Sequence, residues 1–282
     1  MSSLKHILPE SAIGTTRETV RRWRFQMRYA SARFRSLPHF IIIGAMKGGT
    51  TSLFYYLAQH PQVLSGYGEE IHFFNKHFAK GPQWYRAHFP LRKRVSTDRI
   101  TGEATPQYSF NPLVPKRIHE MVPGAKLITI LRNPTERAIS HYFHEVKKKR
   151  ETLPILKAFQ AEEGRLEKIL HENDFTNPVY FHASYKKRGL YGEQLQRFMQ
   201  YFPREQFLVL SSEEFFSDPE EIIRQAFCFL EVDENFKVRD MKPRNVGSNR
   251  TEVGPEVYEY LNDYFSSHNQ ELFALLGRKF HW

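Results

Sequence analysis

The segment GAMKGGTTS, residues 44–52, combines a lysine, paired glycines and hydroxyl side chains in a pattern suited to binding an anion. Lys47 directly precedes Gly48 and Gly49. Glycines let backbone N–H groups approach a ligand closely, and a helix that begins after them adds its partial positive charge. The segment therefore predicts a site for a phosphate or a related group. The alternative is a tight strand-to-helix turn capped by a threonine, with Lys47 in water.

An arginine and a serine farther along the chain form a second candidate anion site. Arg132 is followed by Asn133 and Pro134, a pair that starts helices, and Ser140 lies about two turns into the expected helix. An arginine fork next to a hydroxyl suits a terminal phosphate. The alternative is that the Asn-Pro pair only caps the helix and that Ser140 is buried.

Short apolar runs precede both candidate sites and are typical of buried strands. Strands are expected at residues 40–43, 62–64, 126–131 and 206–210, and helices after residues 49, 133 and 218 and at 255–276. This alternation predicts an α/β fold: a single domain with a central, mostly parallel sheet flanked by helices. Because ligands bind beyond the carboxyl ends of such strands, Lys47 and Arg132 are expected at two ends of one ligand.

Basic residues are concentrated at the N-terminus. Of the net charge of +10, residues 1–38 supply +6, from eight Lys or Arg against two Glu. One apolar helical face is formed there by Val20, Trp23, Met27, Ala30 and Phe34. Such a helix could lie on an anionic membrane or mimic a transit peptide; the interpretation we favour is a helix packed on the domain with its arginines in water. We predict a helical basic extension at 1–37 and one domain at 38–282.

Cysteine usage and hydropathy narrow the class of protein. Cys228 is the only cysteine, which excludes an intramolecular disulfide and a cysteine metal cluster, and its apolar neighbours predict a core position. No stretch approaches the 18 apolar residues of a membrane-spanning helix, and the first 30 residues lack a signal-peptide centre. We expect a soluble, cytoplasmic protein.

Seven motifs in consistent order resemble the sulfotransferases that use 3'-phosphoadenosine 5'-phosphosulfate (PAPS). They are FIIIGAMKGGTTSL, EEIHFF, GEATPQY, LRNPTERAISHYFH, RGLYGEQLQRFMQYFP, FLVLSSEEFFSDP and NVGSNR, within residues 38–282. The branch most resembled contains the heparan sulfate glucosaminyl sulfotransferases and their soluble bacterial relatives. The resemblance implies an enzyme that moves a sulfuryl group to a hydroxyl, less readily an amine, of a saccharide, glycolipid or small metabolite and releases 3'-phosphoadenosine 5'-phosphate (PAP).

The resemblance also implies roles for individual residues. The P-loop-like cradle of the 5'-phosphosulfate would be Lys47, Gly48, Gly49, Thr50, Thr51 and Ser52. Arg132 and Ser140 would hold the 3'-phosphate, and Asn249 and Arg250 fall where the family makes further contacts to the cofactor.

The motif EEIHFF would supply the catalytic base. By resemblance Glu70 takes that role, with His72 supporting it or contacting the acceptor, and Lys47 would stabilise the developing charge. Taken without the other motifs, Glu70 would be an exposed loop carboxylate and His72 a structural histidine. Because sulfate leaves on a stable phosphate, we expect turnover without a metal.

Two departures from the family bear on the acceptor. Ala104 stands where the glucosaminyl branch has a lysine, and a single cysteine cannot form the family's late disulfide, so heparan sulfate itself is not the expected acceptor. The basic runs 147–150 and 186–188 could line a cleft for an acidic saccharide, but we favour solvated faces.

Two other functions remain as alternatives. A P-loop kinase or NTPase would need a lysine directly before the first hydroxyl residue and a carboxylate after a strand, whereas Gly49 precedes Thr50 and Arg132 follows the 126–131 run. A non-enzymatic nucleic-acid-binding or membrane-binding protein would use the Arg-rich N-terminus. The chain lacks a recognisable nucleic-acid motif, so we expect no nucleic-acid partner.

Overall fold

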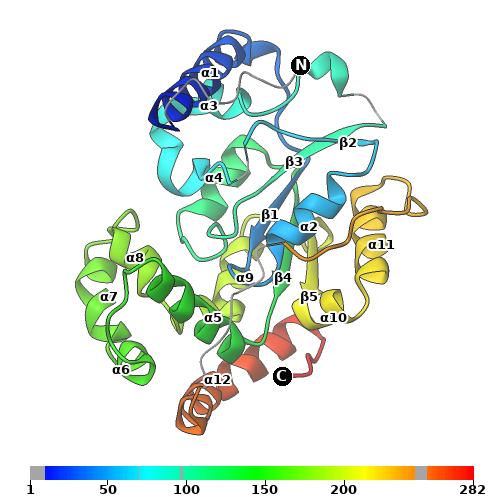
Figure 1. Cartoon of the computed structure of the whole chain (residues 1–282). Coiled ribbons are helices and arrows are strands. Elements are labelled where there is room, and N and C mark those ends of the chain that lie inside the picture. The colour runs from blue at the N-terminus through cyan, green and yellow to red at the C-terminus, as the bar shows by residue number, and fades with distance from the viewer. Residues whose placement is uncertain (1–9, 69, 96–97, 245–252) are drawn as a thin grey trace.

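A five-stranded sheet in the order β2-β3-β1-β4-β5 forms the centre of the computed structural model (Figure 1). The structure describes residues 10–68, 70–95, 98–244 and 253–282, with side chains from residue 19 onward. The strands are β1 Phe40–Gly44, β2 Val63–Leu64, β3 Ile100–Ala104, β4 Lys126–Leu131 and β5 Phe207–Ser211. Every neighbouring pair is parallel, which confirms the predicted α/β class.

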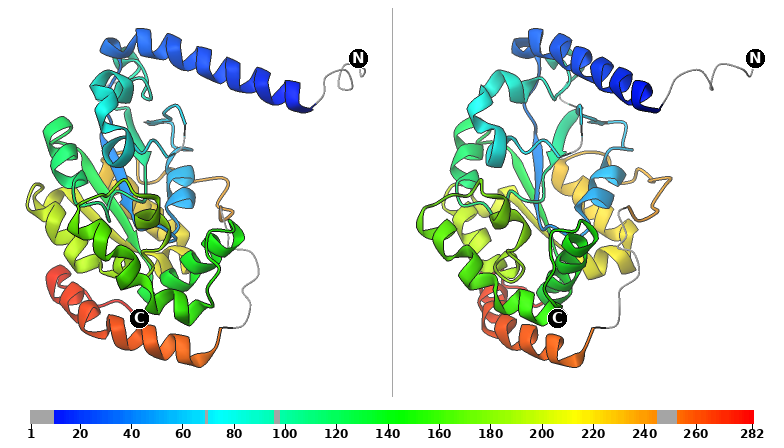
Figure 2. Two further views of the ribbon diagram at one scale, coloured as in Figure 1. Left: turned by 90° about the vertical axis from the view of Figure 1, so that its left-hand side faces the viewer. Right: turned by 60° about the vertical axis from the view of Figure 1, so that its left-hand side comes forward.

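Helices cover both faces of this sheet (Figures 1 and 2). α2 Thr50–Leu57 and α11 Pro219–Leu230 pack on one face, and α4 Val114–Met121 and α9 Tyr191–Met199 pack on the other. The other α-helices are α1 Glu10–Ala30, α3 Gly81–Arg86, α5 Pro134–Lys147, α6 Ile155–Gln160, α7 Glu162–His171, α8 Pro178–His182, α10 Ser212–Ser217 and α12 Pro255–Leu276. None of the described helices is long and apolar enough to cross a membrane.

Strand β1 is central because both of its faces are apolar. All five of its residues are buried. Phe40 and Ile42 pack with residues of α2 and α11, whereas Ile41 and Ile43 pack with residues of α4 and α9. Alternate side chains of a strand point to opposite faces, so this short run contributes to two cores.

Helix ends follow the signals in the sequence. The Asn133 side chain caps α5 by accepting hydrogen bonds from Thr135 N at 2.9 Å and Glu136 N at 3.3 Å. Asp218 caps α11 in the same way, and Gly277 ends α12 with a φ of 61°. These local interactions explain why the predicted starts after residues 133 and 218 are confirmed.

Strand β3 is the strand that the apolar pattern missed. Its sequence, ITGEA, mixes apolar, small and charged residues, yet it lies between β2 and β1. Gly102 faces the ring of Phe40, where an added Cβ would lie only 2.5 Å from ring carbons. The glycine and a buried carboxylate, Glu103, weaken the strand signal but suit this tightly packed position.

Two predictions about side-chain exposure, for Cys228 and for the basic run 186–188, were wrong. Cys228 is exposed, because α11 turns Ala226 and Phe227 toward the core and directs the cysteine away from it. The basic run 186–188 is not a solvated face: Lys186 and Arg188 are buried. Ion pairing explains the buried lysine, whose Nζ lies 2.7 Å from a carboxylate oxygen of Glu163. The run 147–150 is exposed, as expected.

The favoured prediction, that α1 packs on the domain, is confirmed, but the contacts are not those that the periodicity suggests. The helix does pack on the domain, but it does so through Phe25 and Arg28. The predicted apolar face points outward, with Val20, Trp23 and Met27 exposed by 42%, 63% and 57%. Periodicity identified the apolar face correctly, but the buried face is chosen by specific hydrogen bonds and ring contacts.

Candidate functional site

The loop between β1 and α2 has the geometry of an anion cradle. Gly48 approaches β4 so closely that an added Cβ would lie 2.4 Å from Ile130 O. Gly49 adopts a φ of 109°, which favours glycine, and forms the N-cap of α2 without a capping side chain. The N–H groups in the first turn of α2 can therefore face a ligand.

Lys47 joins this loop to the second candidate site. It has a φ of 71°, and its carbonyl oxygen accepts a hydrogen bond of 3.3 Å from Nη1 of Arg132. Burial lowers the pKa of Lys47, and the neighbouring cations Arg132 and Lys148 lower it further, partly offset by Glu145. A lysine in surroundings dominated by positive charge gains by binding an anion.

Arg132 and Ser140 lie where the carboxyl end of β4 meets α5. Arg132 follows β4, which neighbours β1, and its Nη2 lies 3.3 Å from Glu136 Oε2. Ser140 is half-buried in α5. The structure brings Arg132 to the Lys47 loop and places Ser140 on the adjoining helix. Their shared contact with a 3'-phosphate stays a prediction.

The hydroxyl residues that start α2 differ in exposure. Thr50 and Ser52 are buried, and Thr51 is half-buried. The Ser52 hydroxyl accepts a hydrogen bond of 2.8 Å from Arg244 N, so it anchors the segment that follows α11. The predicted contacts at Asn249 and Arg250 lie outside the described residues.

Glu70 and His72 form a pair in the loop after β2. The His72 Nε2 atom lies 3.0 Å from Glu70 Oε2, with side-chain exposures of 18% and 44%. His72 has a φ of 53°, and Asn75 Nδ2 lies 3.4 Å from its other ring nitrogen. An accessible carboxylate oriented by a histidine has the arrangement expected of a general base.

A buried carboxylate, Glu103, is linked to this loop by hydrogen bonds through Thr105. It accepts hydrogen bonds from the hydroxyls of Tyr85 at 2.5 Å, Thr105 at 2.8 Å and Tyr108 at 3.2 Å. The Thr105 oxygen in turn accepts a hydrogen bond of 3.4 Å from the backbone N–H of His72. Burial raises the pKa of Glu103 to about 7, although the three hydroxyls lower it.

A histidine of helix α5, His144, is influenced electrostatically by both the Lys47 loop and the Glu70 pair. Burial lowers the pKa of His144 to about 4, and nearby Lys47, Lys148 and Arg150 contribute, whereas Glu70 opposes the shift. Lys47 and Glu70 therefore act on the same imidazole from two different loops. A common reaction centre for Lys47 and Glu70 stays a prediction.

Several polar residues that lie beside these two loops were not predicted from the sequence. Glu145, which is buried, has a carboxylate oxygen 3.5 Å from Arg150 Nη1 and 3.4 Å from His182 Nδ1. The available signal was helical spacing, because His144 falls one turn after Ser140 on α5. The contribution of His182 could not be found this way, since α8 is distant in sequence.

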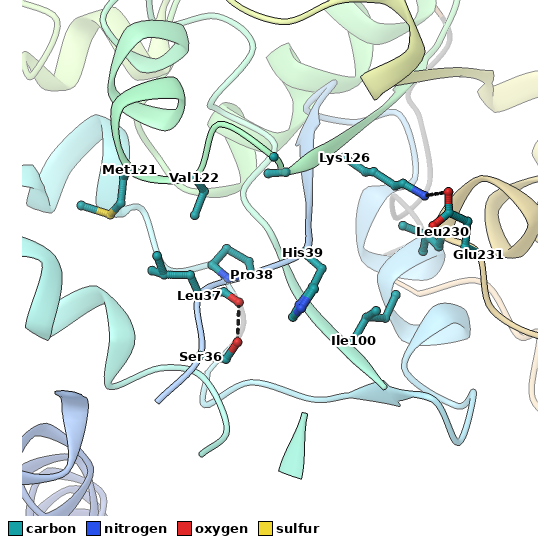
Figure 3. A pocket seen from close by; sticks show the side chains of 12 residues that line it. Ser36, Leu37, Pro38, His39, Ile100, Met121, Val122, Lys126, Leu230 and Glu231 are labelled. Atoms are coloured by element: carbon teal, nitrogen blue, oxygen red, sulfur yellow. Dashed lines mark hydrogen bonds and ion pairs between the residues drawn. The ribbon is translucent and has the colours of Figure 1, made fainter. Parts of the chain in front are cut away.

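A pocket of about 440 Å³ lies at the opposite end of the sheet (Figure 3). Its lining includes residues that precede or begin strands, among them His39, Ile100 and Lys126, and the end of α11. Ligands of parallel α/β sheets bind beyond the carboxyl ends of the strands, so this pocket is not the candidate site. Among the described residues, no group of three His, Cys, Asp or Glu could hold a metal ion, and metal independence stays a prediction.

The chain matches known sulfotransferases over most of its length. Residues 37–252 match the sulfotransferase domain family. Heparan sulfate glucosamine 3-O-sulfotransferase 6 from Homo sapiens is 32% identical over 270 residues, which cover 88% of this chain and 74% of that protein. The membrane-associated sulfotransferase kil1 from Dictyostelium discoideum is 29% identical over 315 residues, which cover 87% of this chain and 66% of that protein.

A solved structure supports the same assignment. The crystal structure of a sulfotransferase from Alicyclobacillus acidocaldarius aligns with a TM-score of 0.70 and 32% identity, covering 87% of this chain and 98% of that chain. The chain therefore belongs to the sulfotransferase domain family and is a sulfotransferase. The predicted family, enzyme class and P-loop-like α/β fold are confirmed.

Proposed function

We propose that this sulfotransferase uses PAPS as its donor and transfers the sulfuryl group in line to a saccharide hydroxyl. The observation that carries the proposal is the hydrogen bond from Arg132 to the Lys47 carbonyl oxygen, at the carboxyl ends of adjacent strands. Two candidate phosphate-binding loops in direct contact suit a ligand with phosphates at both ends, as PAPS has.

The residues present fit such a donor. The close approach at Gly48 and the uncapped start of α2 suit the phosphosulfate, while Arg132 and Ser140 suit the 3'-phosphate. When bound, PAPS supplies the sulfuryl group and a stable phosphate leaving group. The Lys47 ammonium stabilises negative charge that develops beside the loop.

Glu70 is proposed as the base that accepts the proton of the acceptor hydroxyl. His72 holds one of its carboxylate oxygens and leaves the side chain accessible. Exposed Lys148 and Arg150, which act on His144 together with Glu70, would contact anionic groups of the acceptor. A relative that acts on heparan sulfate glucosamine supports a saccharide, but Ala104 supplies no cation where that branch has lysine.

Thermal stabilisation by PAP tests the donor assignment. PAP at about 100 times its dissociation constant should stabilise the wild-type protein by about 2.7 kcal/mol. Arg132→Ala should respond weakly, whereas Arg224→Ala, which removes an exposed ion-paired arginine of α11, should respond as wild type does. Equal stabilisation of the wild type by ATP with magnesium would contradict the proposal. Labelled PAPS and a panel of neutral and acidic saccharides would then identify the acceptor.

A further inference from the structure

Helix α1 is attached to the domain by one face only. Arg28 donates hydrogen bonds to Ala87 O at 2.7 Å and to Phe89 O at 2.8 Å. Phe25 packs on the ring of His88 with a centroid distance of 4.9 Å, and Tyr67 donates a hydrogen bond of 2.8 Å to the carbonyl of Arg21. These contacts fix the orientation of the helix and therefore determine which side chains face away.

The outward face of α1 carries a stripe of exposed apolar side chains. Val20, Trp23 and Met27 are 42%, 63% and 57% exposed, and Ala30 is exposed as well. At about 100° per residue these four positions span roughly 80° of the helix and lie roughly 150° from the attached face. Phe34, 55% exposed, follows just after the helix. Such a cluster on a surface marks an interaction site.

Positive charge surrounds this apolar stripe. Residues 19–35 contain six arginines and no acidic residue, and Arg22, Arg24 and Arg33 are exposed. The exposed basic turn Arg92–Arg94 lies beside the end of α1, because Arg92 Nε donates a hydrogen bond of 3.3 Å to Arg35 O. The occupant of this surface must therefore be apolar in part and anionic in part.

We propose that α1 binds the surface of an anionic lipid bilayer. Val20, Trp23 and Met27 enter the boundary between head groups and acyl chains, and the exposed arginines contact lipid phosphates. A nucleic acid would use the arginines but leave the apolar stripe in water. A second copy of the chain would cover the stripe but bring two sets of arginines together, which costs free energy.

This attachment leaves the reaction centre accessible. Figure 2 shows α1 at the end of the molecule where β1 begins, whereas the Lys47 loop follows the other end of that strand. The helix therefore reaches a membrane from the end of the molecule opposite the Lys47 loop, which Arg132 contacts. Membrane binding and sulfuryl transfer can be measured as separate properties of the same protein.

Vesicle co-sedimentation with the full chain tests the proposal. Wild type should bind phosphatidylcholine vesicles that contain about one third phosphatidylglycerol, bind pure phosphatidylcholine much more weakly, and dissociate at about 1 M salt. Trp23→Gln with Met27→Gln should lower vesicle binding about tenfold or more while the circular dichroism spectrum and PAP stabilisation stay unchanged. Absence of binding, or equal binding by this variant, would overturn the proposal.

A matched pair of single variants controls for surface hydrophobicity. Val20 and Leu113 are both 42% exposed, but Leu113 precedes α4, away from the stripe. Val20→Gln should weaken vesicle binding several-fold, and Leu113→Gln should not. If the double variant instead converts a dimer into a monomer by light scattering, or abolishes RNA binding, the stripe serves another partner and the membrane proposal fails. If PAP did not stabilise the wild-type protein, the donor assignment would be contradicted and the membrane result would be unaffected.

Discussion

Two carboxylates near the carboxyl ends of the strands, Glu70 and Glu103, have opposite surroundings. The Glu70 side chain is 44% exposed and is held by the ring of His72. Glu103 is 1% exposed and accepts hydrogen bonds from three hydroxyls. The comparison teaches that residue type alone does not distinguish a reacting group from a supporting one. Because Glu70 is accessible, it suits proton transfer from an acceptor. Because Glu103 is buried and bonded to Thr105, it suits positioning of the loop that carries His72.

The largest effect is expected from Glu70→Gln. If Glu70 is the base, kcat should fall by about 10²–10⁴, because the amide cannot accept the acceptor proton. PAP stabilisation and the melting temperature should stay close to those of wild type. Glu234→Gln is the matched control, since Glu234 is a 42% exposed, ion-paired carboxylate outside the site. Sulfuryl transfer from labelled PAPS is the measurement, and an active Glu70→Gln enzyme would exclude the proposed base.

A smaller loss of activity, but a larger loss of stability, is expected from Glu103→Gln. The amide nitrogen cannot accept the hydroxyl hydrogen bonds that Glu103 receives, so at about pH 4.5 the free energy of unfolding should fall by about 1–3 kcal/mol. Thr105, which accepts a hydrogen bond from the backbone of His72, would then be held less firmly, and kcat should fall by about tenfold. Urea unfolding and turnover measure both. If kcat fell as far as in Glu70→Gln with unchanged stability, the comparison would be reversed.

The pH dependence of stability sharpens the same contrast. Burial raises the pKa of Glu103 from 4.5 to about 7, so the folded protein keeps a proton that the unfolded chain has lost. The free energy of unfolding of wild type should therefore fall as pH rises from about 4.5 to about 7. The destabilisation caused by Glu103→Gln should be largest at the acidic end of this range. Glu162, whose pKa burial also raises to about 7, titrates in both proteins and cancels. A pH-independent difference would show that Glu103 has an ordinary pKa.

The smallest effect is expected from Tyr85→Phe. The substitution removes the hydroxyl that lies 2.5 Å from Glu103 but keeps the ring, which stacks on Phe73 with a centroid distance of 4.5 Å. Stability should fall by about 1 kcal/mol and kcat by less than about twofold. Tyr55→Phe is the control, because its hydroxyl bonds Asp240 at an exposed site. A large loss of kcat in Tyr85→Phe would place this hydroxyl nearer the chemistry.

The sequence predicts those parts of the fold and site that local patterns determine. The apolar runs of β1 and β4, the paired glycines and the Asn-Pro helix start each have a local physical cause, and each was found within a residue of its expected place. The roles proposed for Lys47, Arg132 and Glu70 came from resemblance and remain predictions.

The remainder depends on tertiary contacts that a pattern does not contain. Strand β3 was missed because Gly102 and Glu103 suit a partner ring and three hydroxyls that come from elsewhere in the chain. The face of α1 that contacts the domain was not predicted, because Arg28 donates to two carbonyl oxygens that lie 59 and 61 residues away in the sequence. In both cases the deciding partner is distant in sequence.

The ion pair between Arg132 and Glu136 has a consequence for donor affinity. The guanidinium is held at 3.3 Å by the Lys47 carbonyl and at 3.3 Å by the Glu136 carboxylate. Ordering a long side chain on binding costs about 0.5–1.5 kcal/mol of conformational entropy. Because folding already restricts Arg132, much of that loss does not recur when a ligand arrives. Glu136 would thus strengthen donor binding through the rigidity of its neighbour, without touching the donor itself.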